Sequence, residues 1–203
     1  MCSNAGPTLL ARLLEQPEIP QARNVAIYCA DAGEQRGEVD TDTLAATLLA
    51  AGKRLFVPYV WPPGATDAGG LASGCRMDMV RVRDLEAWRA LPVGRWGIRE
   101  PIIDRDTEFA YSAAGDPTPL DLIIMPGLGF DAQGGRIGFG RGYYDEYVRF
   151  CDRWADARGT PRPRLLAMCL PEQLVPETMP REEHDHRPVD RVILLPPRQM
   201  GPL

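Results

Sequence analysis

A glycine-rich stretch holds the residues best suited to chemistry. Between Met125 and Asp145 the chain carries seven glycines and two arginines, Arg136 and Arg141. Closely spaced glycines let backbone N–H groups converge on an anion, and a helix that follows them adds the positive end of its dipole. Guanidinium groups bind phosphate oxygens through charge-assisted hydrogen bonds. The stretch therefore predicts a phosphate-binding loop.

The glycine spacing leaves a second interpretation open. Gly138, Gly140 and Gly142 alternate with other residues, but the stretch lacks the Lys-Ser/Thr ending of a Walker loop and the spacing of a dinucleotide fingerprint. A glycine-rich surface turn with two solvated arginines fits the same residues. The residue types favour phosphate, whereas the spacing does not identify a ligand.

Apolar runs around the loop predict the elements that must position it. Continuous runs predict buried strands at 25–30, 53–60, 121–126, 165–170 and 189–195, and alternation predicts a half-exposed strand at 76–82. Helical spacing predicts helices at 8–14, at 44–52 and from Tyr143 to about Trp154. The strand, helix and strand within 25–60 form a βαβ unit with a parallel strand pair. We expect an α/β fold, a three-layer sandwich around a mostly parallel sheet.

The composition is that of one ordinary globular domain. The chain has 203 residues, 44% of them hydrophobic, and a formal net charge of −5. We expect one domain over 1–203 and no nucleic acid partner, since phosphate-backbone binders carry a basic surplus. No apolar run approaches the ~20 residues that cross a bilayer, and the N-terminus lacks a signal-peptide pattern. Five scattered cysteines do not form a zinc or redox motif, and those at 29 and 169 are expected to be buried, unreactive thiols. We expect an intracellular, cytoplasmic monomer with no membrane partner, or a mitochondrial one if an upstream segment is missing.

Several motifs together resemble one known family, the 5-formyltetrahydrofolate cyclo-ligases. In that family a strand ending in Pro-Gly is followed by Phe-Asp, by Gly-x-Arg-Leu-Gly and by Gly-x-Gly-Tyr-Tyr-Asp. Residues 126–145 match this order, with Ile137 in place of the leucine. Further matches in the right order are Gly37–Thr41, Ala51–Arg54, Met77–Arg81, Trp96–Pro101 and His184–Asp190. The resemblance extends from about Leu9 to Leu194.

The resemblance implies a ligase that uses ATP and Mg²⁺. Such an enzyme converts 5-formyltetrahydrofolate into 5,10-methenyltetrahydrofolate through a phosphorylated formyl group, an iminium phosphate, and releases ADP and phosphate. The family also implies a fold that resembles the NagB/RpiA/CoA-transferase-like fold. Two alternatives stay open. One is a turnover-deficient protein that binds folate or nucleotide on the same fold, and the other is a sugar-phosphate or CoA-handling enzyme of a related fold.

The resemblance also assigns roles to individual residues. It implies that ATP contacts Arg136, Ile137, Gly138, Phe139, Gly140, Arg141, Gly142, Tyr143 and Tyr144. It implies that the reduced folate contacts Cys29, Glu38, Trp96, Phe139, Gly140, Arg141, Gly142 and Tyr143. The expected catalytic residues are Arg136, Arg141 and Tyr143, because phosphoryl transfer needs positioning and charge neutralisation more than a protein nucleophile. For Cys29, Trp96 and Tyr143, packing in the core is the alternative role. Glu38 could instead belong to the cap of the following helix.

Two carboxylates are the implied magnesium ligands. By position these are Asp145, at the start of the predicted helix, and Asp185, near the other end of the chain. Carboxylates and phosphate oxygens form a normal shell for Mg²⁺. Asp145 could instead be a carboxylate that favours a helix N-terminus, and Asp185 could belong to a solvated acidic turn. His184 and His186 lack the further ligands that zinc requires.

The N-terminus departs from the family pattern. The family usually begins with a basic helix whose Lys-x-x-Leu-Arg residues reach the ATP phosphates. Residues 1–21 contain Arg12 and no lysine. The sequence therefore predicts that this helix is absent and that ATP is held less firmly.

Overall fold

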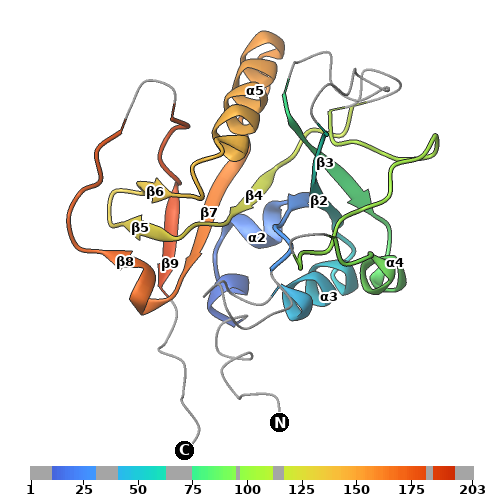
Figure 1. Ribbon diagram of the computed structural model, residues 1–203, viewed down its shortest axis with the longest axis horizontal. Coiled ribbons are helices and arrows are strands. Elements are labelled where there is room, and N and C mark those ends of the chain that lie inside the picture. The colour runs from blue at the N-terminus through green and yellow to red at the C-terminus, as the bar shows by residue number, and fades with distance from the viewer. Residues whose placement is uncertain are drawn as a thin grey trace, which may run out of the picture.

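A six-stranded sheet runs through the middle of the protein (Figure 1). The computed structural model describes residues 11–30, 41–62, 75–94, 97–111, 117–181 and 185–194. Within them the strand order is β3-β2-β1-β4-β7-β9. The strands are β1 (Asn24–Ala26), β2 (Arg54–Val60), β3 (Met77–Val82), β4 (Leu122–Met125), β7 (Arg164–Cys169) and β9 (Arg191–Leu194). Every neighbouring pair is parallel except β2 with β3. The predicted mostly parallel sheet is confirmed.

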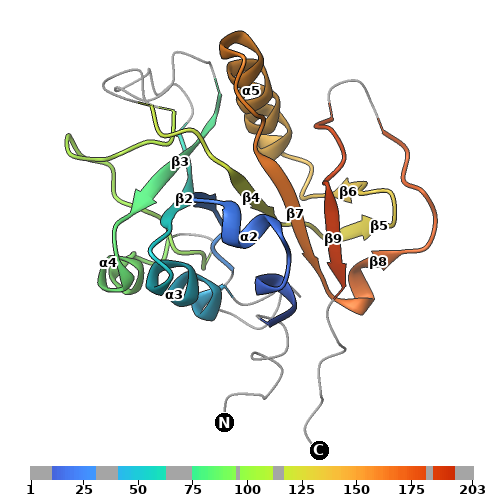
Figure 2. The same ribbon diagram turned by 180° about the vertical axis from the view of Figure 1, so that it is seen from behind.

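The helices cover both faces of this sheet. They are α2 (Glu18–Gln21), α3 (Asp42–Ala50), α4 (Leu85–Ala90) and α5 (Tyr143–Arg158), with a 3₁₀ turn at Pro171–Gln173. Residues 11–14 are also helical. Figures 1 and 2 show α5 separated from α3 and α4, with strands between them. The βαβ unit appears as predicted, because α3 connects the parallel strands β1 and β2.

Alternation along β4 shows how the two faces are packed. Leu122 and Ile124 pack in one core cluster with side chains of α3 and α4. Ile123 and Met125 pack in a second cluster with side chains of α5. All four are fully buried, so the continuous apolar run serves two cores at once. The three-layer arrangement is confirmed.

The strand predicted at 76–82 is present as β3, but the prediction that it is half exposed is wrong. β3 is almost entirely buried, because Val80 bridges to Phe109 and the chain around Phe109 covers the outer edge of the strand. Asp78 is buried as well, and its carboxylate accepts a 2.7 Å hydrogen bond from Trp61 Nε1. A buried polar residue with a partner has the same sequence pattern as an exposed one, and alternation alone cannot separate the two.

A second, small sheet lies beside the β7–β9 edge (Figures 1 and 2). It has the order β6-β5-β8, with β5 (Gly129–Asp131), β6 (Arg136–Ile137) and β8 (Leu174–Val175). Strands this short leave no periodic signal, and sequence analysis did not find them. α5 is also longer than predicted. It ends where Gly159 takes a left-handed conformation, φ +62°, and its N–H bonds back to the helix.

Two further findings bear on the sequence expectations. In the described parts of the chain no helix is both long and apolar enough to cross a membrane. Cys29 and Cys169 are buried, as predicted, and burial raises the pKa of the two thiols to about 12 and about 11.

Candidate functional site

The glycine-rich stretch forms a hairpin, a loop and the start of a helix. The chain leaves β4, forms the β5–β6 hairpin, passes through the loop 138–142 and enters α5 (Figure 1). Gly140 and Gly142 have φ angles of +73° and +69°, a conformation that strains other residues. Gly142 is also the N-cap of α5 and contributes no side-chain cap. The N-terminal N–H groups of a long helix thus lie directly after the loop.

Asp131 fixes the turn of the β5–β6 hairpin. Its side chain is fully buried, and its carboxylate accepts backbone hydrogen bonds of 2.9 Å from Gln133, 2.7 Å from Gly135 and 2.8 Å from Met179. Burial alone would raise the pKa of this carboxyl, but the backbone donors outweigh burial and lower it. Asp131 therefore joins the hairpin to the segment around Met179 and plays a structural part.

Arg136 is the centre of a buried polar cluster. Its side chain is 7% exposed, and Nη2 lies 3.2 Å from both carboxylate oxygens of Asp145. Nε donates a 2.8 Å hydrogen bond to Nε2 of His186, and Nη1 donates to the Pro126 carbonyl at 3.3 Å. A Cβ at Gly138 would come within 2.5 Å of Nη1, so a larger residue there would push the guanidinium away from these partners. One guanidinium thus ties β6, the first turn of α5 and the C-terminal segment together.

His186 belongs to this buried cluster, and sequence analysis missed its part there because it weighed the residue only as a zinc ligand. Because Nε2 accepts a hydrogen bond from Arg136, and because Nδ1 contacts the Arg187 carbonyl, the imidazole is neutral with its proton on Nδ1. Burial, and then the charge of Arg136, lower the pKa of His186. Its backbone N–H also lies 3.4 Å from Oδ1 of Asp145. No signal in a single sequence indicates this pairing, since the partners are 50 residues apart.

Asp145 and Asp185, the two expected magnesium ligands, line one small cavity together with Arg136, Arg181 and His186. Burial would raise the pKa of Asp145, but the Arg136 guanidinium and the His186 backbone N–H keep it lowered, so this carboxyl is ionised. Within the described ranges no three His, Cys, Asp or Glu side chains come together as a metal site. Two carboxylates on one cavity nevertheless fit a hard cation that takes its other ligands from phosphate.

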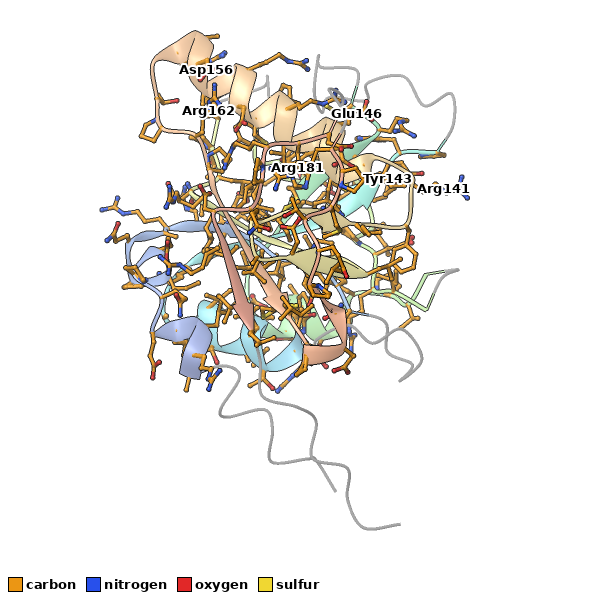
Figure 3. All side chains as sticks on the ribbon, turned by 90° about the vertical axis from the view of Figure 1, so that its left-hand side faces the viewer. Arg141, Tyr143, Glu146, Asp156, Arg162 and Arg181 are labelled. Atoms are coloured by element: carbon orange, nitrogen blue, oxygen red, sulfur yellow. The ribbon has the colours of Figure 1, made fainter. Side chains whose placement is uncertain are left out.

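The loop residues lie mainly at the surface. Arg141 is exposed, and Figure 3 shows its side chain reaching outward beyond Tyr143. Ile137 and Phe139 are exposed apolar side chains. Tyr144 lies near the buried cluster, with the Arg136 guanidinium carbon 5.9 Å from its ring centroid. The structure thus brings Arg136, Tyr144, Asp145 and Asp185 together and places the Arg141 guanidinium on the outside of the loop.

The expected folate contacts are distributed differently. Cys29 is buried in the core cluster that includes side chains of α3, which agrees with core packing as its alternative role. Tyr143 is half-buried at the start of α5. Glu38 and Trp96 lie outside the described residues.

Comparisons with known proteins place the chain among enzymes of one kind. Residues 4–195 match a family model described as the 5-formyltetrahydrofolate cyclo-ligase family. The 5-formyltetrahydrofolate cyclo-ligase of Mus musculus is 31% identical over 91% of this chain and 79% of its own length. A probable 5-formyltetrahydrofolate cyclo-ligase of Caenorhabditis elegans is 31% identical over 86% of this chain and 74% of its own length. A solved structure of a 5,10-methenyltetrahydrofolate synthetase from Mycoplasma pneumoniae superimposes with a TM-score of 0.53 at 16% identity, covering 92% of this chain and 82% of the other, and it supports the fold.

Proposed function

Because this chain belongs to the 5-formyltetrahydrofolate cyclo-ligase family, we propose that it converts 5-formyltetrahydrofolate into 5,10-methenyltetrahydrofolate in an ATP-dependent reaction. ADP and phosphate are the other products. The observation that carries the proposal is the meeting of Arg136 with Asp145 directly beside a glycine-rich loop and a helix N-terminus. That arrangement offers backbone donors and positive charge to a triphosphate and carboxylate oxygens to its metal ion.

The chemistry explains why such a site needs no protein nucleophile. N5 carries the formyl group, and the oxygen of that group is a poor leaving group until it takes the γ-phosphoryl group of ATP. Its transfer breaks the bond between the γ-phosphorus and the bridging oxygen, so ADP leaves. The N10 amine then attacks the activated carbon, loses its proton, and phosphate departs with the former formyl oxygen. Both steps depend on orientation and on stabilising charge, which fixed arginines and backbone N–H groups supply.

Several loop residues have distinct roles in this proposal. The backbone N–H groups of 138–142 and of the first turn of α5 bind phosphate oxygens, and the exposed Arg141 adds a positive charge from the surface. Arg136 supplies a fixed charge from inside the cluster. Tyr143 and Phe139 offer aromatic surface to the flat pterin ring. Cys29, Glu38 and Trp96 stay predictions for the folate side of the site, as do the cytoplasmic location and the monomeric state.

Asp145 and Asp185 would hold Mg²⁺, because they line one small cavity together with Arg136. The ion supplies neutralisation of the charge on phosphate oxygens. In the structure the Arg136 guanidinium is the cation beside Asp145. Phosphate oxygens compete with Asp145 for Arg136, and a metal ion compensates the carboxylate that they displace. We therefore expect ATP and Mg²⁺ to bind more tightly together than separately.

An absorbance assay on the purified chain tests the proposal. 5-Formyltetrahydrofolate is mixed with ATP and Mg²⁺, and the methenyl product is followed at its absorption band while ADP is quantified. We expect methenyl product and ADP in equal amounts, and neither without ATP or without Mg²⁺. A folded chain that binds MgATP and forms no methenyl product would contradict the assignment.

A further inference from the structure

Arg76 makes three contacts with the junction between the glycine-rich loop and α5. The residue directly precedes β3 and lies 65 positions before Arg141 in the chain. Its Nη2 donates a 2.9 Å hydrogen bond to the carbonyl of Arg141, and its Nε lies 2.9 Å from Oε2 of Glu146. Its guanidinium carbon also lies 4.9 Å from the centroid of the Tyr143 ring. Figure 3 shows Arg141, Tyr143 and Glu146 gathered on one side of the molecule, where the loop enters the helix.

These contacts fix the direction of a backbone donor. The C=O and N–H groups of one trans peptide unit point in opposite directions. Because Arg76 holds the Arg141 oxygen, the N–H of Gly142 is directed away from Arg76. Gly142 has the left-handed φ of +69°, and a Cβ there would lie 3.8 Å from Nη2 of Arg76, in ordinary contact. The guanidinium thus packs against the peptide unit on which the phosphate loop turns into α5.

The geometry suits an arginine and does not suit a lysine. A planar guanidinium can direct one N–H at the Arg141 carbonyl and another at Glu146 while its face lies over Tyr143. A lysine ammonium is a point charge on a flexible stem, and it has no planar face to lay over Tyr143 while it bonds the other two groups. The Arg76 side chain is 54% exposed, so its ion pair with Glu146 is worth little to global stability. The contacts act on the loop and on Tyr143 locally.

We propose that Arg76 is a positioning residue for ATP, which clamps the loop 138–142 and the Tyr143 ring in the form that accepts the phosphates. The inference rests on the proposed function, because it names the loop as the nucleotide site. Arg76 acts through the loop backbone and makes no contact with the reacting atoms. It raises the affinity for ATP and does not change the rate of the chemical step.

Two measurements on the full chain test the clamp, with Arg76→Ala, Arg76→Lys and the control Arg83→Ala. Arg83 is also an exposed arginine, and it pairs with Glu108 near the other end of β3. The first measurement is the rate at which trypsin cuts after Arg141 without ligand, followed by mass spectrometry. Arg76→Ala should raise this rate about fivefold through local opening of the loop, with Arg76→Lys intermediate and Arg83→Ala unchanged.

The second measurement is the Kd for MgATP by calorimetry without folate. Arg76→Ala should raise it about fivefold, again with Arg76→Lys between and Arg83→Ala unchanged. In turnover, the KM for ATP should rise to the same extent while kcat stays within about twofold of the wild type.

The combinations of outcomes separate the possible failures. A raised Kd with unchanged cleavage would overturn the clamp and make Arg76 a direct phosphate ligand. Faster cleavage with an unchanged Kd would overturn its role for the nucleotide. If both change but the wild type turns over no 5-formyltetrahydrofolate, the clamp stands and the proposed reaction falls.

Discussion

The two arginines of the glycine-rich stretch lie in opposite environments. Arg136 is buried and engages Asp145, His186 and a backbone carbonyl, whereas Arg141 is exposed and reaches into solvent. The sequence interpretation treated them as equivalent phosphate ligands. In the structure Arg136 holds the buried cluster together, whereas the Arg141 side chain is open to solvent and accessible to a ligand. Substitutions at the two positions should therefore differ in kind.

The largest effect is expected for Arg136→Ala. Removal of the guanidinium leaves Asp145 and His186 without their shared partner in a mostly buried cluster, at a cost of about 2–3 kcal/mol in the free energy of unfolding. Urea unfolding measures this loss. Arg136→Lys keeps the charge but not the three-way hydrogen bonding, and should recover only part of the stability. A free energy of unfolding equal to that of the wild type in Arg136→Ala would show that this cluster does not stabilise the fold.

The second largest effect is expected for Asp131→Asn, which tests the hydrogen bonds that fix the turn of the β5–β6 hairpin. The asparagine keeps one acceptor oxygen but turns an N–H group toward a backbone donor, which costs about 1–2 kcal/mol. The folded-state pKa of Asp131 lies below the unfolded value of about 3.9, so its ionisation stabilises the fold above that pH. This stability is lost as the pH falls through the folded-state pKa. Urea unfolding between about pH 2 and pH 5 should show a shallower pH dependence in Asp131→Asn than in the wild type. Identical slopes would assign the acid sensitivity to other carboxyls.

Arg141→Ala should change binding without changing stability. The lost charge-assisted contact with phosphate should raise the Kd for MgATP about tenfold. The free energy of unfolding should stay within about 0.5 kcal/mol of the wild type, because the side chain is exposed. Calorimetry and urea unfolding on the same preparation give both values. A destabilised Arg141→Ala, or one with unchanged ATP affinity, would remove the contrast between the two arginines.

The smallest effect is expected for Asp185→Asn. If Asp145 and Asp185 share the metal ion, the variant should need several-fold more Mg²⁺ for half-maximal turnover, while the KM for the folate stays the same. Glu177→Gln, an exposed acidic residue outside the cavity, is the control. A magnesium titration of Asp185→Asn that overlays the wild type would show that Asp185 does not bind the ion and belongs to a solvated acidic turn.

The sequence predicted the elements that are set by local pattern. The apolar runs gave β2, β4 and β7 to within about a residue or two, and the glycines gave the loop and the start of α5. It did not predict contacts between distant segments. His186 on Arg136 and Arg76 on the Arg141 carbonyl join residues 50 and 65 positions apart. Burial of Asp78 was missed for the same reason, since Trp61 satisfies its carboxylate from outside the strand.

Hydrogen–deuterium exchange with and without MgATP tests most directly whether the glycine-rich loop is the nucleotide site. The account predicts that MgATP slows exchange at the backbone N–H groups of 138–146, in the loop and the first turn of α5. Exchange in α3 and α4, which pack on the opposite face of the sheet, should stay as it was. Protection of another segment, with 138–146 unchanged at saturating MgATP, would contradict the account.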